Sequence, residues 1–290
     1  MTNNQMFKNI LIPISSEFYS KAVLEQGAFL AAKFQSTITL IYIIEEKMLN
    51  QADKLSDTYR TSVERTETKK AIIKEHRHTA DAIVFDDAKR YLTNRGVPLE
   101  EKVIKGEFSN VVKTELSTKN YDLVLMGFAK GCILNYRLLD EVHIPIWVVA
   151  ESSDHSMLAV CSNLAPNQKV PTVSIKLSQV LGWNLHMVYV VDTQDNVEVD
   201  EQGLRSNKKP LRELIAKGQR FVQDMEQKGI DARVVTGSLE KATGKVAEGI
   251  GANLVIVGRE QKKSSTLGLP VKSVKRKMAE QCRYSILFLN

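Results

Sequence analysis

The sequence predicts an α/β protein made of two tandem doubly wound domains, each a five-stranded, mostly parallel sheet with helices on both faces. A pattern occurs twice: an apolar stretch ending in glycine, a spacer of helix length, and a second apolar stretch ending in glycine. Gly106 and Gly127 end the stretches of the first copy, Gly237 and Gly258 those of the second, and both pairs lie 21 residues apart. Short continuous apolar stretches are typical of parallel strands buried on both faces. The 131-residue period is too long for a solenoid and indicates two similar domains.

The first half contains the expected elements in order. Apolar runs and β-branched residues indicate strands, near-helical spacing of apolar residues indicates helices, and Gly96 with Pro98 just beyond it marks the end of a long charged helical region. The predicted elements are a strand at 9–14, a helix at 18–34, a strand at 37–44, one long helix or two at 54–94, the repeated unit at 103–127, and a last strand at 145–149.

The second half repeats this order, with Pro210 near the start of its second helix and Gly229 at that helix's end. Its predicted elements are a strand at 157–161, a helix at 170–181, a strand at 185–191, a helix at 210–229, the repeated unit at 234–258, and a last strand at 285–289. The boundary is placed in the short polar stretch at 152–154, which gives domains 1–152 and 153–290. The first half has 16 extra residues in its charged helical region.

Composition restricts the class of protein. A chain of 290 residues with 43% hydrophobic and 26% charged residues fits two globular domains. No apolar run approaches the roughly 20 residues of a membrane span, and residues 1–7 lack a secretory signal, so we expect a cytoplasmic protein without a membrane partner. Three scattered cysteines predict neither a disulfide framework nor a zinc site. The net charge of +6 without a nucleic-acid-binding motif makes a nucleic-acid partner unlikely.

The order, spacing and duplication of these elements resemble the universal stress protein family over essentially the whole chain. The residues that carry the resemblance are Ile10–Ile14 and the two repeated units that end at Gly127 and Gly258. The resemblance implies a nucleotide site with an aspartate after the first strand and a loop of the form G-x2-G-x9-G-[S/T]. Glycines let backbone amides approach phosphate oxygens, and a helix start adds a favourable dipole.

The first half departs from this pattern. Ser15 occupies the aspartate position, and Lys130 stands where the second glycine belongs. Only 18 residues separate Gly127 from the last strand, against 27 in the second half, so the spacer for the phosphate loop is too short. We therefore expect no ATP site in the first half.

The second half keeps the loop length but not the glycines. The residues at the corresponding positions form the candidate nucleotide site, with Asp192 added because it ends the second strand at the ligand-binding edge and could contact a ribose or a metal. These residues are Ser162, Asp192, Gly258, Gln261, Lys272 and Ser273. The segment 259–277 is also strongly basic, and cations can replace amides as phosphate ligands.

The sequence leaves three functions open. The first is a non-enzymatic stress-response binding or regulatory protein whose nucleotide binding is lost or weak. The second is a genuine ATP or ADP binder that uses the second-half loop, with slow hydrolysis at most. The third is a scaffold that docks an acidic protein partner through the basic segment 259–277. No catalytic residue and no metal site are predicted. The apolar last strands predict that the two halves pair with each other, and a homodimer is a further possibility.

Overall fold

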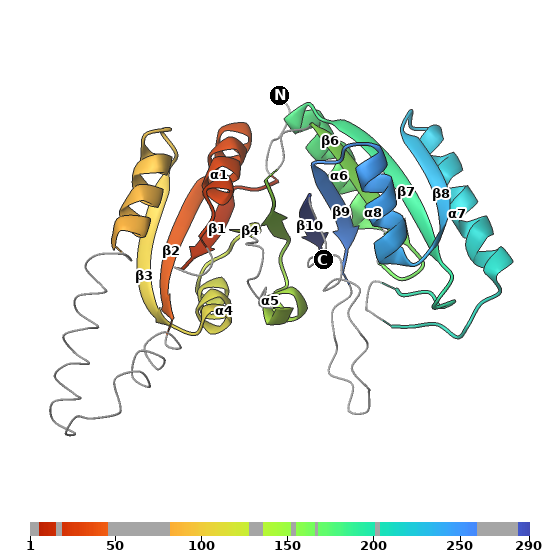
Figure 1. Cartoon of the computed structure of the whole chain (residues 1–290), viewed down its shortest axis with the longest axis horizontal. Helices are drawn as coiled ribbons and strands as arrows, with labels where there is room; N and C mark the ends of the chain where they lie inside the picture. The colour runs from red at the N-terminus through yellow and green to blue at the C-terminus, as the bar shows by residue number, and fades with distance from the viewer. Residues whose placement is uncertain are drawn as a thin grey trace, which may run out of the picture. The chain divides into compact units, whose positions relative to one another are not determined.

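The computed structural model describes residues 6–15, 19–45, 82–127, 136–151, 155–165, 168–200, 204–259 and 284–290. Their contacts divide the chain into two compact units, residues 1–135 and 136–290. Ten strands are found in the described residues, four in the first unit and six in the second (Figure 1). Each unit is described separately below.

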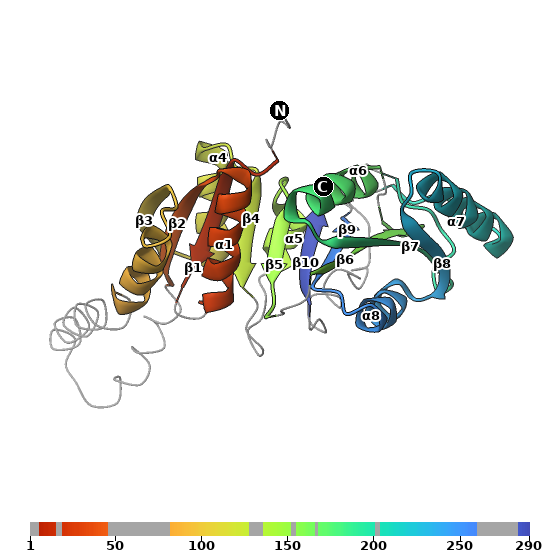
Figure 2. The ribbon, with the colours of Figure 1, turned by 90° about the horizontal axis from the view of Figure 1, so that it is seen from above.

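The first unit is a parallel sheet with the strand order β3-β2-β1-β4. Helix α1 and a helix over residues 82–93 cover one face, and α4 covers the other (Figure 2). The helix at 82–93 stops at Gly96, which adopts φ +68°, so the predicted stop signal is confirmed. The elements are β1 (Asn9–Ile14), α1 (Lys21–Phe34), β2 (Thr37–Glu45), β3 (Leu99–Gly106), α4 (Phe108–Thr118) and β4 (Leu123–Gly127).

The second unit is a sheet with the strand order β5-β10-β9-β6-β7-β8. All its strand pairs are parallel except β5 with β10, which is antiparallel. Helices α6 and α7 cover one face and α8 covers the other (Figure 2). The elements are α5 (Tyr136–Glu141), β5 (Ile146–Val149), β6 (Ser156–Ser162), α6 (Lys169–Leu181), β7 (Asn184–Asp192), α7 (Leu211–Glu226), β8 (Asp231–Gly237), α8 (Leu239–Gly249), β9 (Leu254–Gly258) and β10 (Ser285–Leu289).

The cores consist of the central strands, because helices on both faces exclude water from them. Every residue of β4, β5, β9 and β10 is buried. The edge strand β3 instead has only half-buried and exposed positions and carries Glu100, Glu101 and Lys102. Charged side chains on an edge strand oppose pairing with another chain.

The last strands of the two sequence repeats pair with each other, as predicted. Val148, Trp147 and Ile146 of β5 lie opposite Ile286, Leu287 and Phe288 of β10. This pairing places β5 in the second unit, so the division between the compact units falls after residue 135. The boundary at 152/153 remains a prediction about where one sequence repeat ends and the next begins. The compact units are defined differently, by which residues contact one another.

The described helices include none that is both long enough and apolar enough to cross a bilayer.

Candidate functional site

The strand order of each unit identifies the place where a ligand would bind. In the second unit the chain runs from β6 to β7 and β8 on one side, and then returns to β9 on the other side of β6. In open α/β sheets the crevice outside the carboxyl ends of the strands at such a switch point is the ligand site. The relevant ends are Ser162 of β6, Asp192 of β7 and Gly258 of β9.

The structure therefore places three of the predicted site residues at one edge of the sheet. Ser162 and Asp192 are buried polar residues, and Gly258 is buried as well. The hydroxyl of Ser162 accepts a hydrogen bond from the Leu164 amide at 3.1 Å. Gln261, Lys272 and Ser273 lie outside the described residues, so the full predicted set remains a prediction.

The carboxylate of Asp192 is engaged by the protein itself. Its Oδ1 accepts hydrogen bonds from the amides of Gln194 and Asp195 at 2.8 and 3.0 Å. Its Oδ2 accepts one from the amide of Leu239, the first residue of α8, at 2.7 Å. An anion at this position satisfies an otherwise unpaired helix amide and interacts favourably with the helix dipole. Asp192 therefore acts as a cap for α8, although Ser238 occupies the N-cap position.

Asn163, directly after β6, is a central residue that the sequence reasoning missed. Its Oδ1 accepts a hydrogen bond from the Asp192 amide at 2.7 Å. Its Nδ2 donates to the carbonyls of Asp195 and Val197 at 3.2 and 2.8 Å. Its own backbone carbonyl accepts a hydrogen bond from the Val199 amide at 2.8 Å. The only available indication was its position: it is the polar residue after the strand that should supply the nucleotide-binding aspartate.

These bonds fix residues 193–200, which we call the cover segment, across the carboxyl end of β6. Val197 and Val199 are buried, with 8% and 7% of their surface exposed. Glu198, between them, forms ion pairs with Lys209 and Lys217 at 2.7 and 3.0 Å. Burial alone would raise the pKa of Glu198, but the hydrogen bonds from these two lysines outweigh it and lower that pKa. The cover segment is thus held by hydrogen bonds to Asn163 and by the ion pairs of Glu198 with Lys209 and Lys217.

In the first unit, the corresponding glycine serves close packing. A Cβ added to Gly127 would lie 2.9 Å from Val23 Cγ2 and 3.0 Å from Ser20 Cβ, at the start of α1. This contact leaves no room for a side chain at the carboxyl end of β4. Ser15, at the aspartate position, is fully buried, and Lys130 lies outside the described residues.

Arg259 requires a correction to the sequence interpretation. It is the first residue of the basic segment 259–277, which the sequence offers as a docking surface for an acidic partner, but only 2% of its surface is exposed. Its guanidinium donates to the carbonyls of Leu139 and Ile144 at 3.0 and 2.7 Å, and also to that of Val142. Arg259 therefore contributes nothing to a basic docking surface. The remaining cations of the segment lie outside the described residues.

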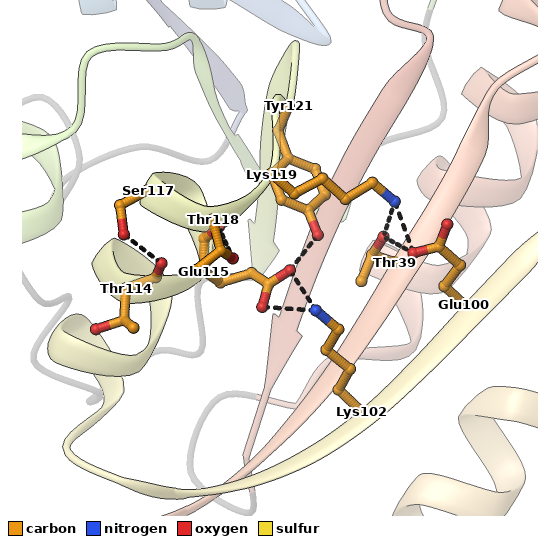
Figure 3. A network of polar contacts seen from close by, with 9 residues as sticks. All are labelled: Thr39, Glu100, Lys102, Thr114, Glu115, Ser117, Thr118, Lys119 and Tyr121. Carbon is orange, nitrogen blue, oxygen red and sulfur yellow. Dashed lines mark hydrogen bonds and ion pairs between the residues drawn. The ribbon is translucent and has the colours of Figure 1, made fainter.

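A second polar network lies in the first unit, on the amino-terminal halves of β2 and β3 (Figure 3). Glu115 of α4 is buried, accepts two bonds from Lys102 Nζ at 2.7 and 2.9 Å, and accepts one from the Tyr121 hydroxyl at 2.6 Å. Beside it, Lys119 Nζ contacts Glu100 Oε2 at 2.6 Å.

This network fixes α4 against the sheet. Burial would raise the pKa of Glu115, but the hydrogen bonds from Lys102 and Tyr121 dominate and lower it. Burial, together with the bond to Glu115, raises the pKa of the Tyr121 hydroxyl. With its donors and acceptors paired within the unit, the network has a structural role. Among the described residues, no group of three or more His, Cys, Asp or Glu side chains is arranged to hold a metal.

The fold and the topological switch points define a class: tandem doubly wound α/β proteins. Residues 6–161 match the model of the universal stress protein family. This match spans more than half of the chain, and the protein therefore belongs to the universal stress protein family. No curated protein matches the chain.

Solved structures show the same fold over the whole length. A universal stress protein from Pseudomonas aeruginosa UCBPP-PA14 aligns with a TM-score of 0.67 and 12% identity, covering 99% of this chain and 94% of that chain. One from Archaeoglobus fulgidus DSM 4304 aligns with a TM-score of 0.61 and 15% identity, covering 99% and 97%. At these identities the likeness establishes the tandem fold alone.

Proposed function

We propose that this chain is a non-enzymatic stress-response protein that acts as a binding or regulatory module and has lost or weakened nucleotide binding. The observation that carries the proposal is the cover segment across the carboxyl end of β6. Asn163 and Asp192, the polar residues beside the switch point, bind the backbone of that segment and the start of α8. A ribose at this edge would have to compete with these internal bonds.

The chemistry of the neighbouring residues supports the same conclusion. Ser162 has a hydroxyl where the family's nucleotide-binding members have a carboxylate, and that hydroxyl already accepts the Leu164 amide. A serine cannot supply the charged, two-oxygen acceptor that an aspartate offers to a nucleotide. Arg259, the first cation after Gly258, is directed to backbone carbonyls within the unit and is not available to a phosphate.

A thermal-shift titration with ATP, ADP and AMP, each with and without magnesium, tests the proposal. A ligand present at 100 times its Kd stabilises the native state by about 2.7 kcal/mol, a readily measured shift. We expect no shift of the melting temperature at millimolar nucleotide. A nucleotide-dependent rise that disappears in both Lys272→Ala and Ser273→Ala would instead establish the ATP-binding alternative.

A further inference from the structure

The side chain of Arg259, in the second sequence repeat, contacts the segment 139–144 of the first repeat. Arg259 directly follows β9, and its own amide donates to the Leu289 carbonyl at 2.7 Å. Its Nη1 donates to the Leu139 carbonyl in α5, at 3.0 Å. Its Nη2 donates to the Val142 and Ile144 carbonyls between α5 and β5. Its Nε donates to the side-chain oxygen of Asn290.

The three carbonyls that accept from the guanidinium belong to residues 139–144, and the short strand β5 begins just after them. The Asn290 amide adds a bond to the Val142 carbonyl at 3.2 Å. Val142 is buried, and a buried carbonyl without a donor is costly. The path of the chain into β5 therefore depends on donors from Arg259 and Asn290.

All four residues of strand β5 are buried, but its hydrogen-bonded pairing with β10 is short. It is four residues long, Ile146–Val149, and its described ladder to β10 joins only Ile146–Val148 to Ile286–Phe288. A short antiparallel pair is marginal without further packing or bonding. At its far end the Ser285 hydroxyl bonds Ala150, accepting from its amide at 3.1 Å and donating to its carbonyl at 3.3 Å. Arg259 and Ser285 thus fix β5 at its two ends.

We infer that Arg259 is a latch that keeps β5 paired with β10 of the same chain and so prevents exchange of β5 between two copies. Without the guanidinium, the carbonyls of Leu139 and Ile144 lose the donors that Arg259 supplies, the Val142 carbonyl keeps only the bond from Asn290, and the segment 138–150 opens more often. The side chains of β5 remain apolar, including Trp147 at 1% exposure, so the released strand still favours β10. Pairing with β10 of a second copy recreates the same contacts, which makes strand exchange a low-cost route to a dimer.

The test compares Arg259→Met and Arg259→Lys in the full-length protein. Methionine keeps the apolar stem and removes every donor, while lysine keeps the charge but cannot span three carbonyls. In Arg259→Met we expect hydrogen exchange in peptides covering 138–150 to accelerate about tenfold or more. We also expect a dimer fraction that grows with concentration in sedimentation equilibrium, and Arg259→Lys should fall between this variant and the wild type.

Two controls separate the latch from general destabilisation. Arg233→Met makes the same change at an exposed position of β8 and should match the wild type. Asn163→Ala removes buried bonds between the end of β6 and the cover segment, outside residues 138–150, and should lower global stability without selective exchange at 138–150. Unchanged exchange at 138–150 in Arg259→Met would overturn the latch. Faster exchange with no added dimer would support the latch and overturn the exchange of strands.

Discussion

The buried carboxylates of the two units, Asp192 and Glu115, have the same role at the residue scale. Asp192 accepts three backbone amides at the end of β7, and Glu115 accepts Lys102 and Tyr121 beside α4. Each carboxylate connects a helix to the rest of its unit. A buried charge is tolerated only when it is fully hydrogen-bonded or paired. Removal of either carboxylate leaves its partners unpaired and should lower the stability of the protein.

Asp192→Ala should lower the free energy of unfolding by about 2–4 kcal/mol, because three amides lose their acceptor and α8 loses an anion at its start. Urea denaturation monitored by circular dichroism measures the change. Asp231→Asn is the matched control, since the Asp231 side chain is 75% exposed and contacts the His186 ring at 2.7 Å. The control should stay within about 0.5 kcal/mol of the wild type. Equal effects of the two variants would contradict the capping role of Asp192.

Glu115 also predicts how stability depends on pH. Its pKa in the folded unit is lower than the ordinary glutamate value of 4.5, so below pH 4.5 the unfolded chain binds more protons than the folded one. The stability from this carboxylate is complete above pH 4.5 and is lost as the pH falls through the folded-state pKa. Urea unfolding between pH 7 and the acid range should show this loss, and Glu115→Gln should flatten the acid limb. An equally steep acid limb in Glu115→Gln would show that other carboxylates cause it.

The central elements could be predicted from the sequence, at the element scale, because a buried strand is a continuous apolar run. The predicted strands 9–14 and 285–289 coincide with β1 and β10. Strand β3 begins four residues earlier than predicted, at Leu99, because its charged start pairs with helices on both faces: Glu101 with Lys89, and Lys102 with Glu115. The cover segment could not be predicted, because it is defined by bonds from its backbone to the side chains of Asn163 and Asp192, which leave no pattern in the sequence.

Two helical glycines of the second unit should respond to alanine in opposite directions. A Cβ at Gly218 in α7 would lie 2.8 Å from Tyr189 Cδ1 and 3.2 Å from Val234 Cγ1, so we expect Gly218→Ala to destabilise by about 1–3 kcal/mol through overpacking. A Cβ at Gly244 in α8 would meet only the Tyr284 hydroxyl, at 4.0 Å. Gly244→Ala should therefore stabilise by about 0.5–1 kcal/mol through helix propensity. Denaturation midpoints measure both changes, and shifts of the same sign would contradict the packing of α7 on β7 and β8.

At the scale of the whole molecule, the repeat in the sequence and the compact units in space differ in one respect. The repeat assigns α5 and β5 to the first half, whereas their contacts lie in the unit of residues 136–290. The glycine spacing could reveal the duplication but not this assignment, because strand pairing between repeats leaves no periodic pattern in the sequence. The position of the candidate site at one edge of the sheet could be predicted from the strand ends. The sequence could not show that its polar side chains, Asn163 and Asp192, are already hydrogen-bonded within the protein.

This difference predicts how fragments of the chain behave. A fragment of residues 136–290 keeps β5 beside β10 and the carbonyls bound by Arg259, whereas a fragment of residues 153–290 loses both. The shorter fragment also leaves a buried guanidinium without these acceptors and exposes an edge of β10, whose residues are all buried in the full chain. We therefore expect the 153–290 fragment to melt at a lower temperature and to self-associate, as measured by calorimetry and light scattering. Equal melting temperatures with both fragments monomeric would mean that β5 adds little to the second unit, and that the sequence boundary at 152/153 is also the physical one.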